Sequence, residues 1–285
     1  MSTYNQLIHK YRKTFIEKGQ TSEVVKAFLF ELCNEKNVNL YLEIDNEADK
    51  QIEERFEEGI NRILNDEPMN YVLGYTYFLG YKICVNEDVL IPRYETEELV
   101  GLILSKYDEY YKDQKIKVCD VGTGSGAIAI ALKKEEDNLE LYASDISGKA
   151  LVVARENAKL NKCDISFMCG SMLDPYIENN IKVDILVSNP PYIKTSETLE
   201  SSVYDFEPHV ALFGGEDGLK FYKEIFAKAK QIVAENGFLF FEIGYDQKEN
   251  LTALAKSYFK DAHIEVFKDI NNKDRMLMIK LQNAN

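Results

Sequence analysis

The tetrapeptide Asn189-Pro190-Pro191-Tyr192 has residue types suited to holding a planar amino group for alkylation. It follows the apolar run 183–188, which predicts a buried strand, so we expect the tetrapeptide at the carboxyl end of that strand. The carboxamide of Asn189 offers an oxygen acceptor, and Pro190 lacks an N–H and presents only its carbonyl. Two such acceptors facing an –NH2 group would orient its hydrogens and expose the nitrogen lone pair, while Tyr192 supplies a flat face. The alternative interpretation is a strand that ends in a rigid diproline turn.

A second group of candidate residues follows two other predicted strands. These residues are Asp120, Gly122, Thr123, Gly124, Ser125 and Gly126, where the first strand, 116–121, meets its helix, and Asp145 at the end of the second. Glycines at a strand-to-helix turn let the backbone approach a ligand closely, and a carboxylate placed as Asp145 is can accept both hydroxyls of a ribose. The Gly-x-Gly-x-Gly spacing differs from that of dinucleotide folds, and no phosphate-binding Gly-Lys-Ser or Gly-Lys-Thr is present. Together with the tetrapeptide, this pattern favours S-adenosylmethionine over a nicotinamide; a glycine turn with a surface aspartate is the alternative.

Composition limits the class of protein. The 285 residues are enough for a small domain and a larger one, and 45% hydrophobic residues indicate a folded chain. The net charge of −14 argues against a protein that mainly grips nucleic acid. Five scattered cysteines without a Cys-x-x-Cys pair predict neither disulfides nor a metal site and fit a reducing cytoplasm. We found no secretion signal or membrane-spanning run.

Three segments with different patterns predict the domain organisation. Residues 1–74 carry helical periodicity, with apolar positions such as Leu7, Tyr11, Phe28, Phe56 and Ile60, and predict a helical bundle. Residues 75–92 read as a β-hairpin that turns near Gly80 and links two domains. Residues 93–285 form the larger domain.

Strand-like and helix-like runs alternate in the larger domain. Such alternation predicts an α/β fold in which helices cover both faces of a parallel sheet. Apolar residues from Leu219 to Val233 predict one long helix before the strand 238–243. A closing hairpin, with strands 263–267 and 276–281, would add one antiparallel strand to the sheet.

Several further segments strengthen a resemblance to the bacterial methyltransferases that modify the glutamine of the Gly-Gly-Gln loop in peptide chain release factors. The resemblance covers nearly the whole chain. Besides residues 189–192, the matching segments are Glu67-Pro68, Tyr71-Val72-Leu73-Gly74, Leu90-Ile91-Pro92-Arg93-Tyr94-Glu95-Thr96-Glu97, Phe206-Glu207-Pro208, Ala211-Leu212, Phe241-Glu242-Ile243-Gly244 and Asp274-Arg275.

The resemblance implies a class I, Rossmann-like methyltransferase domain that uses S-adenosylmethionine, preceded by a helical domain that helps engage the release factor. Two positions depart from the family's usual pattern. Tyr94 stands where a proline is usual, and Met172 stands where an aromatic side chain often lies against the adenine. The thioether of Met172 can still cover a ring, so we retain it as a cofactor-binding residue.

Residues 189–192 are therefore the expected catalytic residues, acting on the glutamine amide by positioning it without a conventional base. A methyltransferase acting on the amino group of adenine in DNA or RNA is the main alternative, and a noncatalytic nucleotide-binding module is another. The acidic balance weighs against the first, and the second leaves the tetrapeptide unexplained. We expect a monomer whose partners are release factors, without stable binding to nucleic acid or membranes.

Overall fold

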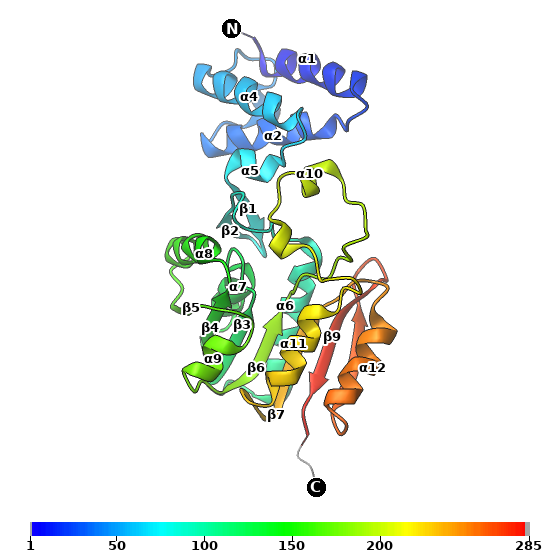
Figure 1. The fold of residues 1–285 in the computed structure, drawn as a ribbon. Coiled ribbons are helices and arrows are strands. Elements are labelled where there is room, and N and C mark those ends of the chain that lie inside the picture. The colour runs from blue at the N-terminus through cyan, green and yellow to red at the C-terminus, as the bar shows by residue number, and fades with distance from the viewer. Residues whose placement is uncertain (1, 283–285) are drawn as a thin grey trace. The chain divides into compact units, whose positions relative to one another are not determined.

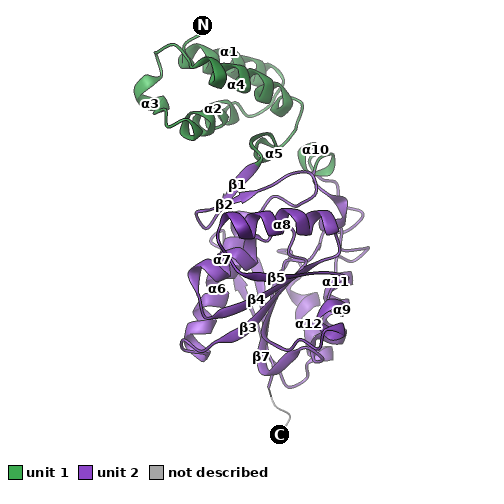
Figure 2. Cartoon of the chain, turned by 90° about the vertical axis from the view of Figure 1, so that its left-hand side faces the viewer, with its two compact units in different colours: residues 1–74, 200–206 green, residues 75–199, 207–285 purple. Residues whose placement is uncertain are grey.

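The computed structural model describes residues 2–282 and divides the chain into two compact units (Figure 2). Unit 1 runs to Gly74 and also includes Glu200–Phe206, and unit 2 contains the remainder. The hairpin that the sequence set apart as a linker lies within unit 2. No helix among residues 2–282 is both long enough and apolar enough to cross a membrane.

Unit 1 is helical, as the periodicity predicts. Its core contains Phe56, whose ring contacts those of Tyr11 and Phe28 at centroid distances of 5.5 and 5.8 Å. Helices α2 and α4 approach closely at Gly59, where an added Cβ would lie 2.3 Å from Cζ of Phe28. The helices are α1 (Tyr4–Glu17), α2 (Glu23–Glu35), α3 (Leu40–Glu43), α4 (Lys50–Ile63), α5 (Met69–Leu73) and α10 (Ser201–Tyr204).

Unit 2 is built around a seven-stranded sheet with the order β5-β4-β3-β6-β7-β9-β8. Its strands are β3 (Ile116–Val121), β4 (Leu139–Asp145), β5 (Ile165–Cys169), β6 (Val183–Ser188), β7 (Val233–Glu242), β8 (His263–Lys268) and β9 (Asp274–Lys280). The first five strands in this order are parallel, and β9 runs antiparallel to both of its neighbours. The predicted α/β fold with one antiparallel strand is confirmed.

Helices cover both faces of this sheet. Figure 2 shows α6 and α7 on one side of the strands and α9, α11 and α12 on the other, and Figure 1 gives their order along the chain. The α11 and α12 side contributes a continuous apolar core with Tyr222, Phe226 and Phe241. The helices are α6 (Tyr94–Tyr110), α7 (Ala127–Glu135), α8 (Gly148–Leu160), α9 (Asp174–Glu178), α11 (Lys220–Ala229) and α12 (Lys248–Tyr258), with the 3-10 turn η1 (His209–Ala211).

The prediction of one long helix that reaches Val233 is wrong at the carboxyl end of the helix. Helix α11 ends at Ala229, and β7 already begins at Val233. The carbonyl of Ile232 accepts a hydrogen bond from the backbone N–H of Val183 at 2.8 Å, which places this segment beside β6. Ile232 and Val233 are buried in the same core that α11 faces, so their spacing in the sequence resembles that of a continuing helix.

The predicted hairpin consists of β1 (Tyr75–Phe78) and β2 (Tyr81–Cys84), paired antiparallel. Leu79 and Gly80 form its two-residue turn, and both have positive φ angles, of 47° and 78°. Positive φ at both positions is the geometry of a type I′ turn, which matches the twist of the flanking strands. The backbone N–H of Leu79 also donates to Oε1 of Glu97 in α6 at 2.8 Å, which ties the turn to that helix.

Candidate active site

The carboxyl ends of the neighbouring strands β4, β3 and β6 meet at one edge of the sheet, where a cavity of about 320 Å³ opens within unit 2. This edge is where ligands bind in open α/β sheets. Two groups of candidate residues, distant in sequence, come together in its wall. The predicted site residues that line the cavity are Gly122, Gly124, Asp145, Met172, Asn189 and Pro191.

The glycine-rich loop is held by hydrogen bonds to the end of β4. The backbone N–H groups of Gly122 and Thr123 both donate to the carbonyl of Ser144 at 2.9 Å. A Cβ built on Gly122 or Gly124 meets nothing within 4 Å, so the cavity leaves room for a ligand against the loop. Gly126 has a different role, because its Cβ would lie 3.3 Å from that of Ala154 in α8. It permits close packing of α7 and α8.

Asp145 presents its carboxylate in the cavity wall with both oxygens already anchored. Its Oδ2 accepts from the backbone N–H of Gly124 at 2.9 Å, and its Oδ1 accepts from that of Ser147 at 2.8 Å. Burial raises the pKa of this carboxyl, and the backbone N–H groups oppose the rise. Each carboxylate oxygen has two lone-pair sites, so both oxygens can accept a further hydrogen bond from a ribose hydroxyl.

Asp120, Thr123 and Ser125 are buried and do not line the cavity. The Asp120 side chain is fully buried, and its Oδ2 accepts from the hydroxyl of Thr123 at 2.6 Å. Its Oδ1 has no hydrogen-bond partner among the described residues. Desolvation therefore raises the pKa of Asp120 to about 7. This arrangement supports the loop.

Replacing Asp120 with Asn should change how the free energy of unfolding depends on pH. An aspartate in the unfolded chain releases its proton at about pH 4, whereas the folded carboxyl keeps it to about pH 7. The folded state binds more protons between these values, so the wild type should lose stability relative to Asp120→Asn as pH rises. We expect a relative loss of about 3 kcal/mol between roughly pH 5 and 8. Urea unfolding of both proteins measures it, and parallel pH dependences would contradict a buried, protonated Asp120.

The tetrapeptide begins directly after β6, as predicted. Among the described residues, neither Oδ1 of Asn189 nor the carbonyl of Pro190 accepts a hydrogen bond. The amide nitrogen of Asn189 donates to the hydroxyl of Thr96 at 3.2 Å. Pro190 is buried, and Pro191 lines the cavity.

Tyr192 does not line the cavity, and its hydroxyl donates to Oε1 of Glu242 at 3.2 Å. Burial and the negative charge of Glu242 raise the pKa of this phenol. The carbonyl of Tyr192 faces Gly218, where an added Cβ would lie 2.4 Å away. The N–H of Gly214 donates to the carbonyl of Ile193 at 2.8 Å, so the segment 214–218 braces the loop that follows the tetrapeptide.

Residues outside the predicted groups complete the cavity wall. They include 88–90, 208 and 210–211. An ion pair joins these two stretches of chain, since Nη2 of Arg93 lies 2.6 Å from Oε1 of the buried Glu207. The segments containing Arg93 and Glu207 stood out in the sequence only as family matches. Their position at the cavity could not be read from local patterns.

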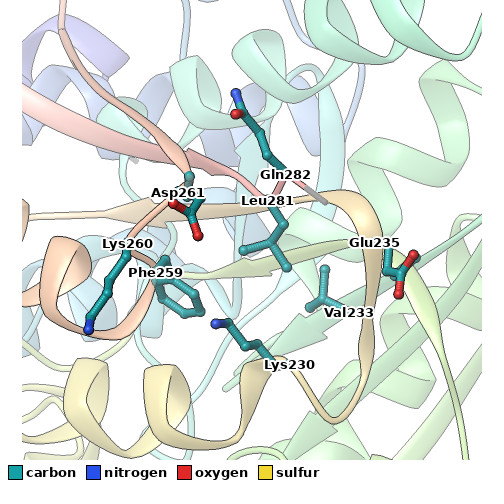
Figure 3. Close-up of a pocket in the computed structure, with 10 residues that line it drawn as sticks. Lys230, Val233, Glu235, Phe259, Lys260, Asp261, Leu281 and Gln282 are labelled. Atoms are coloured by element: carbon teal, nitrogen blue, oxygen red, sulfur yellow. The ribbon is translucent and has the colours of Figure 1, made fainter. Parts of the chain in front are cut away.

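A second cavity, of about 510 Å³, lies at the opposite edge of the sheet, by the start of β7 (Figure 3). Val233, Phe259 and Leu281 form its apolar part, with Lys230 and Asp261 at its rim. None of the predicted site residues lines it. Of these two cavities, the predicted site residues line only the one at the carboxyl edge.

Comparison with known proteins agrees with this fold. Residues 101–206 match the family described as "Methyltransferase small domain". A methyltransferase structure from Pyrococcus furiosus has the same fold, with a TM-score of 0.53 at 15% identity, covering 78% of this chain and 98% of that one.

Two curated relatives are both named release factor glutamine methyltransferase. The Bacillus cereus protein is 37% identical over 285 residues, which is 99% of this chain and all of the relative. The Bacillus subtilis protein is 43% identical over 226 residues, 78% of each chain. With this similarity extending over essentially its full length, the chain belongs to the release factor glutamine methyltransferase family.

Proposed function

We propose that this protein transfers a methyl group from S-adenosylmethionine to the side-chain amide nitrogen of the glutamine in the Gly-Gly-Gln motif of peptide chain release factors. The observation that carries the proposal is a pair of acceptors, Oδ1 of Asn189 and the carbonyl of Pro190, that take no hydrogen bond from the described residues. Asn189 lines a cavity that also presents Asp145. The family membership supports the same substrate.

The cavity fits the proposed donor. Gly122 and Gly124 leave open space where side chains would stand, and the carboxylate of Asp145 has lone pairs for two ribose hydroxyls. Met172 lines the same cavity and has a left-handed backbone conformation with φ of 45°. Its thioether is suited to covering the adenine. When bound, S-adenosylmethionine supplies an electrophilic methyl group on a sulfonium.

The protein's own contribution is to position a poor nucleophile. The lone pair of a glutamine amide nitrogen is delocalised, so its direction must be imposed. Asn189 and the Pro190 carbonyl accept the two amide hydrogens and aim the nitrogen at the methyl carbon. Such positioning can contribute roughly 7–11 kcal/mol to lowering a barrier. The same oxygens stabilise the positive charge that develops on nitrogen, and the proton leaves after transfer, when the nitrogen has become acidic.

We further propose that residues 1–74 engage the release factor. The enzyme would act as a monomer in the cytoplasm without stable binding to nucleic acid. All five cysteines are free, in keeping with a reducing compartment. The net charge of −14 disfavours nonspecific contact with DNA or RNA.

A direct test offers the purified protein three classes of methyl acceptor. A release factor, DNA and RNA are each incubated with the protein and methyl-labelled S-adenosylmethionine, and the label incorporated is counted. We expect label in the release factor alone, and none in a control release factor whose Gly-Gly-Gln glutamine is replaced by alanine. Label in DNA or RNA instead would favour the adenine methyltransferase alternative.

Removing residues 1–74 tests the docking role of the helical segment. A chain beginning at Tyr75 should still bind S-adenosylmethionine, because all cavity-lining residues belong to unit 2. It should lose most activity on an intact release factor, because remote contacts hold the substrate in register. A short Gly-Gly-Gln peptide, too small to use such contacts, should be methylated equally by both proteins. If a well-folded truncated protein matches the full chain on the intact release factor, the docking role is wrong.

A further inference from the structure

A buried carboxylate links helix α6 to both ends of the tetrapeptide. Glu242, the last residue of β7, is 2% exposed. Its Oε2 accepts from the hydroxyl of Thr96 at 2.5 Å, and its Oε1 accepts from the hydroxyl of Tyr192 at 3.2 Å. Thr96, itself 5% exposed, in turn accepts from the amide nitrogen of Asn189 at 3.2 Å. A chain of hydrogen bonds therefore runs from Glu242 through Thr96 to Asn189.

The hydrogen bond between Thr96 and Glu242 determines the direction of the next one, between Thr96 and Asn189. The hydroxyl of Thr96 has a single proton, and it donates that proton to Oε2 of Glu242. Thr96 then has only lone pairs left for Asn189, and these can be met only by the –NH2 side of the carboxamide. The oxygen of Asn189 must consequently face away from Thr96.

Burial and the neighbouring groups act on the Glu242 carboxyl in opposite directions. Burial raises the pKa of Glu242, but the hydrogen bond from Thr96 and the positive charge of Arg275 oppose the rise. Arg275 is held by Oδ2 of Asp269 at 3.2 Å and by the carbonyl of Ile243 at 3.4 Å. These contacts keep its guanidinium beside the end of β7.

We propose that Glu242 and Thr96 are positioning residues that make Asn189 an acceptor toward the substrate. Without them, the carboxamide of Asn189 could rotate by half a turn and present –NH2 to the substrate amide. Two –NH2 groups cannot hydrogen-bond to each other through their hydrogens, so the flipped form would repel the glutamine nitrogen. The inference rests on the proposed function, and it assigns to these two residues the choice between the two orientations.

Replacing Glu242 with Gln tests the polarity argument while preserving the shape of the side chain. A glutamine has one oxygen and one –NH2 group, so it cannot accept from both Thr96 and Tyr192. If its –NH2 group faces Thr96, the threonine proton is released to point at Asn189, and the carboxamide is favoured in the flipped orientation. Glu242→Gln therefore keeps a polar side chain at position 242, but Asn189 no longer presents its oxygen to the substrate.

The experiment compares Thr96→Val, Thr96→Ser and Glu242→Gln with the wild type, using a release factor substrate at saturating S-adenosylmethionine. Thr96→Val and Glu242→Gln should lower kcat by at least about tenfold, while the Kd for S-adenosylmethionine stays close to that of the wild type. Thr96→Ser keeps the hydroxyl and should restore most of kcat. A merely structural role would not produce rescue by serine together with an unchanged donor affinity.

Tyr107→Phe is the matched control for lost stability. Tyr107 is also buried in α6, and its hydroxyl donates to the carbonyl of Gln114 at 2.9 Å, away from the cavity. This variant should lower the thermal unfolding midpoint but retain kcat. The proposal is overturned if Thr96→Val turns over like the wild type, or if folded Thr96→Ser is as impaired as Thr96→Val. A wild type that binds S-adenosylmethionine but leaves the release factor unmethylated would instead overturn the proposed function.

Discussion

Asn189→Ala should retain S-adenosylmethionine binding and lose methyl transfer by about 100-fold or more, in line with the removal of one pre-positioned polar group from an active site. The lost oxygen is the acceptor that faces the reacting nitrogen, so its contribution is largest in the transition state. Single-turnover kinetics at saturating donor measure the transfer step, and calorimetry measures donor affinity separately.

Asn179→Ala provides the control for this substitution. Asn179 also uses its amide nitrogen in a hydrogen bond, to the carbonyl of Pro175 at 2.8 Å, and it does not line the cavity. Its loss should leave the transfer rate near that of the wild type. An Asn189→Ala protein that transfers methyl at a near-normal rate would refute the acceptor mechanism.

Asp145→Ala should weaken S-adenosylmethionine binding by about 10- to 100-fold, because hydrogen bonds to a charged group contribute about 1.5–3 kcal/mol. The substitution also frees the N–H groups of Gly124 and Ser147, so part of the effect should come from a less ordered glycine loop. Calorimetric titration gives the Kd, and circular dichroism establishes that the variant is folded.

Asp137→Ala serves as the charge-matched control. The side chain of Asp137 is fully exposed and does not line the cavity, so its removal changes the net charge and one ion pair with Lys133 at 3.9 Å, away from the site. The donor affinity of this variant should equal that of the wild type. If folded Asp145→Ala binds the donor as tightly as Asp137→Ala does, Asp145 does not hold the ribose.

The strands that build the site could be predicted because most of their residues are buried and because polar residues stand at their ends. The runs 116–121 and 183–188 are observed as β3 and β6 with the same bounds. Parallel strands carry their ends to one edge, so Asp145 and Asn189 could be expected together before any coordinates were known. The sequence does not predict where α11 ends, because buried residues in a strand can have the spacing of a helix.

The supporting contacts could not be predicted, because they join residues far apart in sequence. Thr96 and Glu242 are separated by 146 positions, and no local pattern indicates that one hydroxyl would meet one carboxylate. The burial of Asp120 is another example. An aspartate beside a glycine loop suggests a ligand contact, yet Oδ2 of Asp120 accepts a hydrogen bond from the hydroxyl of Thr123 within the loop.

Fragment-level mass spectrometry of a release factor treated with this protein and S-adenosylmethionine tests the central claim most directly. The account predicts a single added methyl group on the side-chain amide nitrogen of the Gly-Gly-Gln glutamine, present with the wild type and nearly absent with Asn189→Ala. A methyl group on any other residue, or an unmodified glutamine after treatment with folded, donor-binding protein, would contradict it.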